Sequence, residues 1–182
     1  TGFRGDTVVL PATSVVLRAG EVTSVSIPTS RAALSVAIPA PNTGVVTNAA
    51  SYSGAALAPG SLVAIFGRGL AETTASATAL PLPQALAGTQ VLINGVPAPL
   101  LHVSPLQINA QAPFGMEGGE ATVVIRRQGM ESEVMRVPLV EAAPGLFPVA
   151  MKSDFSLISP ASPASRGGIV VLYGAGFGAV TP

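Results

Sequence analysis

Residues 89–99 read TQVLINGVPAP. The central pair, Asn94-Gly95, separates two short apolar runs, and both residue types accept the positive φ of a tight turn. Asn-Gly is the strongest two-residue signal for a β-hairpin, so the sequence predicts a hairpin at this point. Pro97 and Pro99 have no backbone N–H to donate, which places the returning strand at a sheet edge or makes its start irregular.

Similar short strands are predicted on both sides of this hairpin. Runs rich in Val, Ile and Leu recur between Gly, Pro, Asn and Ser, while windows free of Gly and Pro rarely reach the ~10–12 residues of a globular helix. This spacing favours an all-β fold of the sandwich or barrel type. The predicted strands include residues 7–10, 14–17, 22–27, 34–38, 62–66, 89–93, 99–103, 107–111, 121–126, 134–140 and 169–173.

The composition excludes several classes of function. Only 10% of the 182 residues are charged, nine basic residues balance nine acidic ones, and there is no Cys. Nucleic-acid binders carry a basic surface that this chain lacks. A Cys nucleophile, a thiolate metal site and a disulfide framework are excluded as well. The longest apolar runs are much shorter than the roughly 20 residues of a membrane span, so no membrane span is expected.

The chain contains an internal repeat. Residues 59–71 read PGSLVAIFGRGLA, and residues 166–178 read RGGIVVLYGAGFG. Each copy is an apolar strand with an aromatic residue, a Gly-x-Gly turn and a second bulky apolar residue. A period near 100 residues fits tandem sandwich modules.

The repeat predicts three parts along the chain. Residues 1–42 hold about four strands and are too few to bury a core of their own. Residues 43–148 form one complete sandwich module, and residues 149–182 form the opening strands of a second, split module. The expected fold is therefore all-β, with one immunoglobulin-like β-sandwich and strands of another.

Three longer segments carry a family resemblance. Residues 51–71 read SYSGAALAPGSLVAIFGRGLA, residues 80–114 read LPLPQALAGTQVLINGVPAPLLHVSPLQINAQAPF, and residues 141–149 read EAAPGLFPV. Together they resemble the bacterial family called the Solibacter uncharacterized C-terminal domain, and the Gly-x-Gly turn is similar to those of immunoglobulin-like TIG modules. His102 departs from the family pattern, which has Tyr there. The resemblance implies a secreted, immunoglobulin-like module without enzymatic activity.

Several motifs have a plain structural explanation. Residues 174–178 resemble a dinucleotide-binding turn, but no amphipathic helix or ribose-binding acid follows them, so a tight β-turn is favoured. His102 has no nearby acid in sequence and no Gly-x-Ser-x-Gly nucleophile turn to serve, so we expect a half-buried strand residue. The tripeptide Arg4-Gly5-Asp6 matches an integrin motif, which is frequent by chance.

Metal and cofactor sites are not expected. Asp occurs only at Asp6 and Asp154, and there is no Asp-x-Asp-x-Asp run for Ca²⁺. The glutamates of residues 117–133 lie close in sequence to the arginines at 126, 127 and 136. We predict a solvated hairpin face with cross-strand ion pairs.

Gln107 and Asn109 alternate with apolar residues, so their amides point to one face. They either satisfy backbone groups of neighbouring loops or bind a sugar hydroxyl. The sugar hypothesis is weakened by the absence of Trp and by the presence of only two Tyr, Tyr52 and Tyr173.

The missing charge suggests how the chain functions. Soluble β proteins usually protect their edge strands with Lys, yet this sequence has one, Lys152. Uncharged strands in two incomplete ends predict that the ends complete one another. They do so either within one chain or by self-association, in which the terminal strands of one subunit complete the sheet of its neighbour. A head-to-tail contact that does not close would give a filament. The predicted assembly residues are Val8, Val9, Leu10, Val15, Val16, Leu17, Val25, Ile27, Ile169, Val170, Val171, Leu172 and Tyr173.

The sequence therefore predicts a non-enzymatic, extracellular structural subunit that serves in assembly or adhesion. The alternative is a carbohydrate- or surface-binding accessory module of a larger secreted protein. Filaments without glycan binding would favour the first hypothesis, and glycan binding without self-association the second.

Overall fold

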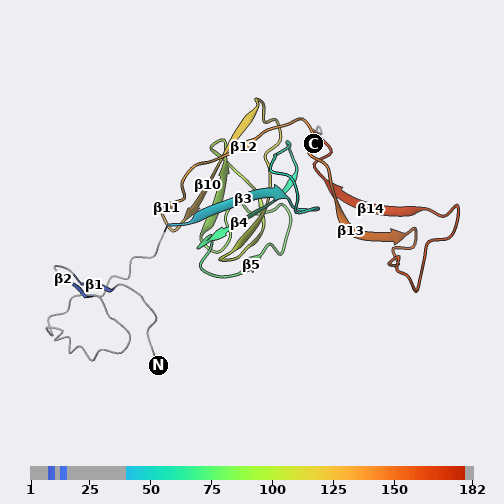
Figure 1. The fold of residues 1–182 in the computed structure, drawn as a ribbon, viewed down its shortest axis with the longest axis horizontal. Coiled ribbons are helices and arrows are strands. Elements are labelled where there is room, and N and C mark those ends of the chain that lie inside the picture. The colour runs from blue at the N-terminus through green and yellow to red at the C-terminus, as the bar shows by residue number, and fades with distance from the viewer. Residues whose placement is uncertain (1–7, 11–12, 16–39, 179–182) are drawn as a thin grey trace, which may run out of the picture. The chain divides into compact units, whose positions relative to one another are not determined.

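A computed structural model describes residues 8–10, 13–15 and 40–178 of the chain (Figure 1). The chain divides into two units, residues 1–39 and 40–182. In the first unit, β1 (Val8–Leu10) pairs antiparallel with β2 (Thr13–Val15). The predicted strands at 22–27 and 34–38, and the assembly residues Val16, Leu17, Val25 and Ile27, lie outside the described residues.

The second unit contains two five-stranded sheets in which every pairing is antiparallel. The described residues contain strands and turns but no helix, so the all-β prediction is confirmed. The first sheet has the order β3 (Asn42–Asn48), β4 (Leu62–Arg68), β9 (Gln107–Gln111), β8 (Leu100–Val103), β5 (Ala75–Ser76). The second has the order β11 (Met130–Glu131), β10 (Glu120–Arg127), β6 (Thr89–Ile93), β7 (Val96–Pro97), and β12 (Met135–Pro138) also pairs with β10.

One hydrophobic core joins the two sheets. Side chains alternate between the faces of a strand, so every second residue of β6, β9 and β10 points inward and is buried. The core draws on both sheets and on the segments beside them, which makes the arrangement a two-layer sandwich. Its largest fully buried side chains include Leu57, Ile65, Leu70, Ile93, Leu100, Ile108 and Ile125.

The predicted hairpin joins β6 to β7. Asn94 has φ 50° and Gly95 has φ 77°, so both central residues adopt the left-handed conformation that the Asn-Gly pair predicted. The Asn94 side chain also accepts a hydrogen bond from Thr122 N on β10, at 2.8 Å. Pro97 lies in β7, the outermost strand of its sheet, as its missing N–H required.

A third, two-stranded sheet is formed by β13 (Gly145–Lys152) and β14 (Val170–Ala175). We call it the C-terminal ribbon. β13 begins before residue 148, the predicted end of the complete module. The ribbon is antiparallel, and its register shifts between Leu146 and Ala150.

The core predicts a strong contrast between two neighbouring residues of β10. Ile125 is fully buried and Val124 is half-buried on the opposite face. Ile125→Ala should lower the free energy of unfolding by about 3 kcal/mol, because it leaves a cavity. Val124→Ala should lower it by about 1 kcal/mol or less. Urea denaturation of both variants measures the difference, and equal losses would contradict the described arrangement of the core.

Candidate assembly site

The C-terminal ribbon repeats the pairing of β3 with β4. In the first pair Thr43 lies opposite Gly67, and in the ribbon Leu146 lies opposite Gly174, the repeat equivalent of Gly67. Each pair then has a register shift, after Thr43 and after Leu146. Beyond the shift, Val46 lies opposite Ile65 and Ala150 opposite Leu172, the equivalent of Ile65. The sequence repeat is therefore also a repeat of strand pairing, although the irregularity inserts one extra residue in β3 and two in β13.

The two pairs differ in what covers them. β4 is bonded to β3 on one edge and to β9 on the other, whereas β13 is the one strand that pairs with β14 in the part of the chain that the structure describes. Ile65 is 0% exposed and its equivalent Leu172 is 55% exposed. Leu70 is 0% exposed and its equivalent Phe177 is 67% exposed. The ribbon thus presents to solvent the side chains that its first copy buries.

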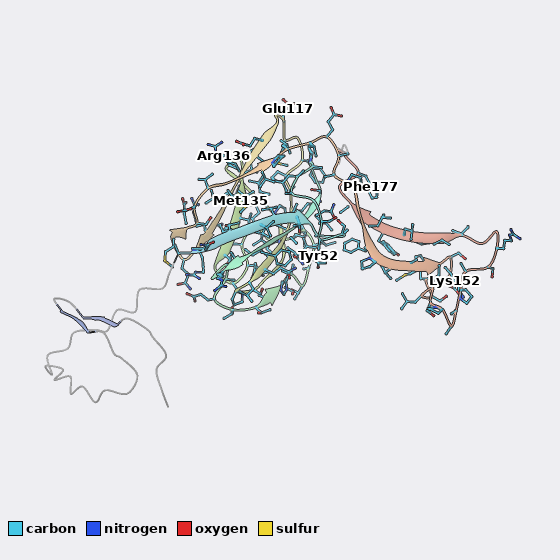
Figure 2. The ribbon with its side chains drawn as sticks, viewed as in Figure 1. Tyr52, Glu117, Met135, Arg136, Lys152 and Phe177 are labelled. Carbon is cyan, nitrogen blue, oxygen red and sulfur yellow. The ribbon has the colours of Figure 1, made fainter. Side chains whose placement is uncertain are left out.

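Exposed apolar side chains are concentrated on and beside the ribbon, and one of them, Phe177, is labelled in Figure 2. Ile169, just before β14, is 71% exposed, and Val171 is half-buried. Of the predicted assembly residues, the structure brings Ile169, Val170, Val171, Leu172 and Tyr173 together in one strand segment. Val8, Val9, Leu10 and Val15 lie in β1 and β2 of the other unit. The large exposed apolar side chains of this region are Leu146, Phe155, Leu157, Ile169, Val170, Leu172, Tyr173 and Phe177.

The polar side chains of the ribbon's loop bond to one another. Ser156 donates from its Oγ and its backbone N to Asp154 Oδ1, at 2.7 and 3.0 Å. These hydrogen bonds, the side-chain one foremost, hold the pKa of the Asp154 carboxyl below its usual value. Lys152 Nζ donates to Ser162 Oγ at 2.8 Å. These contacts engage Lys152 and Asp154, two of the three charged side chains between Lys152 and β14.

Asn48, at the end of β3, attaches the ribbon to the sandwich. Its Nδ2 donates to Ala143 O at 2.8 Å and to Ala175 O at 3.1 Å, and its Oδ1 accepts from Ala50 N at 2.8 Å and Ser51 N at 3.3 Å. The side chain is buried, and these four bonds use both its donors and both its acceptor sites. The start of β13 and the end of β14 are thereby fixed to β3.

The Asn48 carboxamide packs closely against two positions that require glycine, Gly145 and Gly176. A Cβ on Gly145 would lie 2.5 Å from Asn48 Oδ1. Gly176 has φ 83°, and a Cβ there would overlap Ala143 O. The Gly-x-Gly turn of the second copy therefore serves the packing of Asn48, in agreement with the tight-turn interpretation of the sequence.

Asn48 was not singled out from the sequence. It follows the apolar run of β3 and precedes Ala49-Ala50-Ser51, where an Asn normally signals no more than a turn. Its partners lie 95 and 127 residues further along the chain, and no local pattern indicates a contact at that distance.

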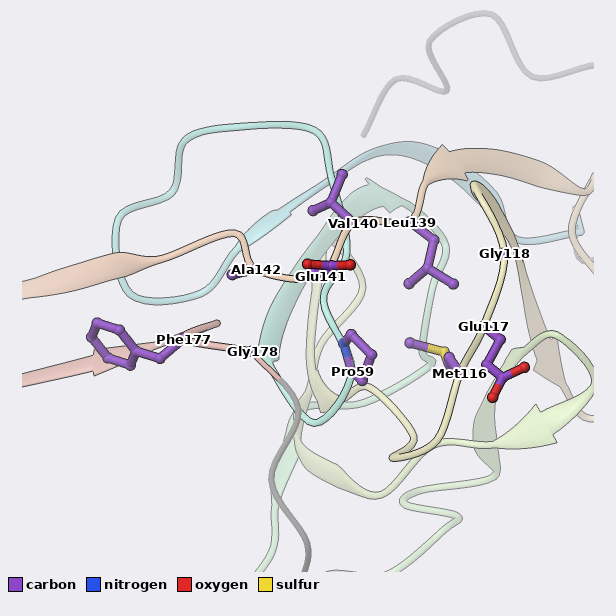
Figure 3. A pocket seen from close by; sticks show the side chains of 10 residues that line it. All are labelled: Pro59, Met116, Glu117, Gly118, Leu139, Val140, Glu141, Ala142, Phe177 and Gly178. Atoms are coloured by element: carbon purple, nitrogen blue, oxygen red, sulfur yellow. The ribbon is translucent and has the colours of Figure 1, made fainter.

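A surface hollow of about 640 Å³ lies beside the root of the ribbon (Figure 3). Pro59, Met116 and Leu139 line it from the sandwich, and Phe177 and Gly178 line it from the segment after β14. Its two carboxylates belong to Glu117 and Glu141. Within residues 8–10, 13–15 and 40–178, no cluster of three or more His, Asp or Glu side chains could hold a metal ion.

The other candidates from the sequence lie on the sandwich. His102 is half-buried in β8, as predicted, and its Nδ1 lies 2.9 Å from Ser76 Oγ. Gln107 Nε2 donates to Asn109 Oδ1 at 2.8 Å, so these amides bond to each other instead of to loop backbone.

The predicted ion-paired hairpin face is confirmed on the second sheet for two of the three arginines. Arg127 is instead buried and donates to Gly69 O. Arg126 bonds to Glu131 at 2.5 Å, and Arg136 bonds to Glu120 at 2.6 Å. Both pairs are exposed, and pairs of this kind contribute at most about 1 kcal/mol each.

Comparison with known proteins leaves the family assignment as a prediction. No protein-family model and no curated protein matches the chain. The part of the chain that the structure describes contains no helix long and apolar enough to cross a membrane.

Replacement of Asn48 by Asp should loosen the ribbon selectively. The carboxylate keeps the acceptor but loses both donors, and it faces the carbonyl oxygens of Ala143 and Ala175. Amide hydrogen exchange in β13 and β14 should become about tenfold faster or more, while β6 and β10 stay protected. Asn42→Asp, at the exposed start of β3, is the matched control. Unchanged exchange in the ribbon of Asn48→Asp would contradict the attachment described here.

The repeat allows one substitution to be tested in two surroundings. Ile65→Ala should cost about 3 kcal/mol in the free energy of unfolding, because the side chain is fully buried. The equivalent change, Leu172→Ala, should cost less than about 1 kcal/mol, because more than half of that side chain already contacts water. Urea denaturation at low protein concentration provides both values. A comparable loss at Leu172 would mean that this face is covered within the single chain.

Proposed function

We propose that this chain is a non-enzymatic, extracellular structural subunit, an assembly or adhesion module whose copies associate through apolar β-strands. The observation that carries the proposal is the C-terminal ribbon, which repeats the strand pairing of β3–β4 but has exposed apolar side chains and, among the described residues, no strand on the second edge of β14. The resemblance to the Solibacter domain family supports the extracellular, immunoglobulin-like part of the proposal.

An isolated ribbon of this kind favours association on physical grounds. Two-stranded sheets are marginally stable in water, and contiguous exposed apolar patches usually mark an interaction surface. A strand added to the β14 edge would complete the ladder of backbone hydrogen bonds and cover apolar side chains at the same time. The β3–β4 pair is an example of this arrangement. There β9 is the added strand: it pairs antiparallel with β4, which continues the ladder of backbone hydrogen bonds and helps to cover the apolar side chains of β4.

The partner we propose is a second copy, which would supply a strand from its N-terminal residues. In β9, Ile108 and Ala110 face the core while Gln107 and Asn109 face outward. Residues 23–27 read TSVSI and have a similar alternation, with Val25 and Ile27 on one side and two Ser on the other. A donated strand at 22–27 would therefore match the place that β9 takes beside β4. If each copy donates to the next and the contact does not close, the product is a filament.

The roles of the other conspicuous residues support a structural function. The Gly-x-Gly turns pack against Asn48 and against Leu70, where a Cβ on Gly67 would lie 2.7 Å from Leu70 Cδ2. The clustered glutamates and arginines form exposed ion pairs. Each of these motifs has a part in the fold itself.

Light scattering on a size-exclusion column and negative-stain microscopy test the proposal. The mass of the full chain should rise above that of one copy with increasing micromolar concentration, and elongated particles should appear. Leu172→Ser on the acceptor side, or Val25→Ser with Ile27→Ser on the donor side, should return the mass to that of one chain. Leu106→Ser is the control, since Leu106 is also highly exposed but lies between β8 and β9. The mass of one chain at every concentration would overturn the proposal.

A further inference from the structure

The outer face of the sheet β3-β4-β9-β8-β5 carries a second set of groups, half-buried amide, imidazole and aromatic side chains that belong to neither strand of the ribbon. Residues that lie directly opposite each other on paired strands share one face of the sheet. Phe66 lies opposite Gln107, and Asn109 lies opposite His102. Their neighbours Ile65 and Ile108 point into the core, so these four side chains lie on the outer face.

This face is nearly free of charge. Arg68, at the end of β4, is the single charged residue in the five strands of the sheet. The strands of the other sheet, by contrast, contain Glu120, Arg126, Arg127, Glu131 and Arg136. A ligand of the first sheet would therefore be recognised by neutral hydrogen-bonding groups and by apolar contact.

An aromatic pair provides the apolar contact. The rings of Tyr52 and Phe66 have centroids 6.0 Å apart and are tilted by 51°. Tyr52 is 56% exposed, and its position is labelled in Figure 2. It has φ 52°, a left-handed conformation that is uncommon for a large side chain and that is found preferentially at functional positions. The turn thus holds an exposed ring beside the sheet at a cost in backbone energy.

The neighbouring amides provide the hydrogen bonds. The bond from Gln107 Nε2 to Asn109 Oδ1 leaves Gln107 Oε1 and Asn109 Nδ2 without a protein partner among the described residues. The pair therefore offers one acceptor and one donor close together, the complement of a hydroxyl group. Thr47, in the same cross-strand row as Asn109, is nine-tenths buried, and its Oγ1 also lacks a partner within the described residues.

We propose that this face binds a neutral saccharide, with a sugar ring stacked on Tyr52 and its hydroxyls bonded to Gln107 and Asn109. A pyranose ring presents C–H groups on its faces and hydroxyls on its rim, which match an aromatic ring beside a donor and an acceptor. The lack of charge fits an uncharged glycan. This activity is separate from the assembly proposed above, because none of its residues lies in β13 or β14.

The first test is an array of neutral oligosaccharides, for which cellohexaose, xylohexaose and chitohexaose are suitable probes, with heparin and polygalacturonate as anionic comparisons. We expect the full chain to bind at least one neutral probe and neither anionic one. Calorimetric titration of that probe then gives the dissociation constant for each variant.

Tyr52→Asn should weaken binding about tenfold, and Asn is chosen because it accepts a positive φ. Gln107→Ala should weaken binding about fivefold, as expected for the loss of one hydrogen bond. Gln90→Ala is the matched control, because Gln90 is also half-buried but lies opposite Arg126 on the other sheet. It should leave the dissociation constant unchanged.

Four results would overturn the saccharide proposal: no binding of any neutral probe, preference for the anionic probes, full affinity in Tyr52→Asn and Gln107→Ala, or a lower assembly mass in these variants. The last would mean that a second copy covers this face. If Tyr52→Asn does not fold, Gln107→Ala decides. Leu172→Ser should keep its sugar binding while it loses assembly, so the two proposals can fail independently.

Discussion

The hydrogen bonds of the Asn48 carboxamide connect the two-layer sandwich to the C-terminal ribbon. One buried side chain satisfies two carbonyl oxygens of the ribbon segment and two N–H groups of the turn after β3. This geometry leaves no room for a Cβ at Gly145 or Gly176, so an Asn and two glycines distant in sequence depend on one another. The ribbon is consequently fixed at its root, while its apolar strand extends into solvent.

The repeat shows how much a strand pair depends on its surroundings. A similar antiparallel pairing and the same Gly-x-Gly turn occur in β3–β4 and in the ribbon, yet Ile65 is buried and Leu172 is exposed. In β3–β4, β9 continues the hydrogen-bond ladder at the second edge of β4, and the second sheet covers its apolar side chains. The sequence of β9, with alternating apolar and polar residues, therefore indicates what kind of strand would fit beside β14.

Local patterns predicted much of this structure. A two-residue hairpin turn requires positive φ at both central residues, and Asn94 and Gly95 accept it, so the hairpin was predictable. Alternating apolar residues define the buried face of a strand, so most strands were predictable as well. The exposure of Leu172 has no local signal, because it depends on which strands lie beside β14, and among residues 40–178 only β13 does. The same holds for Asn48 and for the neighbourhood of Tyr52, Phe66 and Gln107, since contacts across a sheet depend on register.

The distribution of charge suggests different roles for the two sheets and the ribbon. The outer face of β10 and its neighbours carries ion pairs that keep it hydrated and discourage edge-to-edge contact. The opposite sheet has one charged strand residue, Arg68, and carries amides and aromatic rings, and β14 of the ribbon has no charged residue. A ligand with hydroxyl groups and a partner strand would therefore find different surfaces, so assembly through β14 would leave the neutral face of each copy accessible along the polymer.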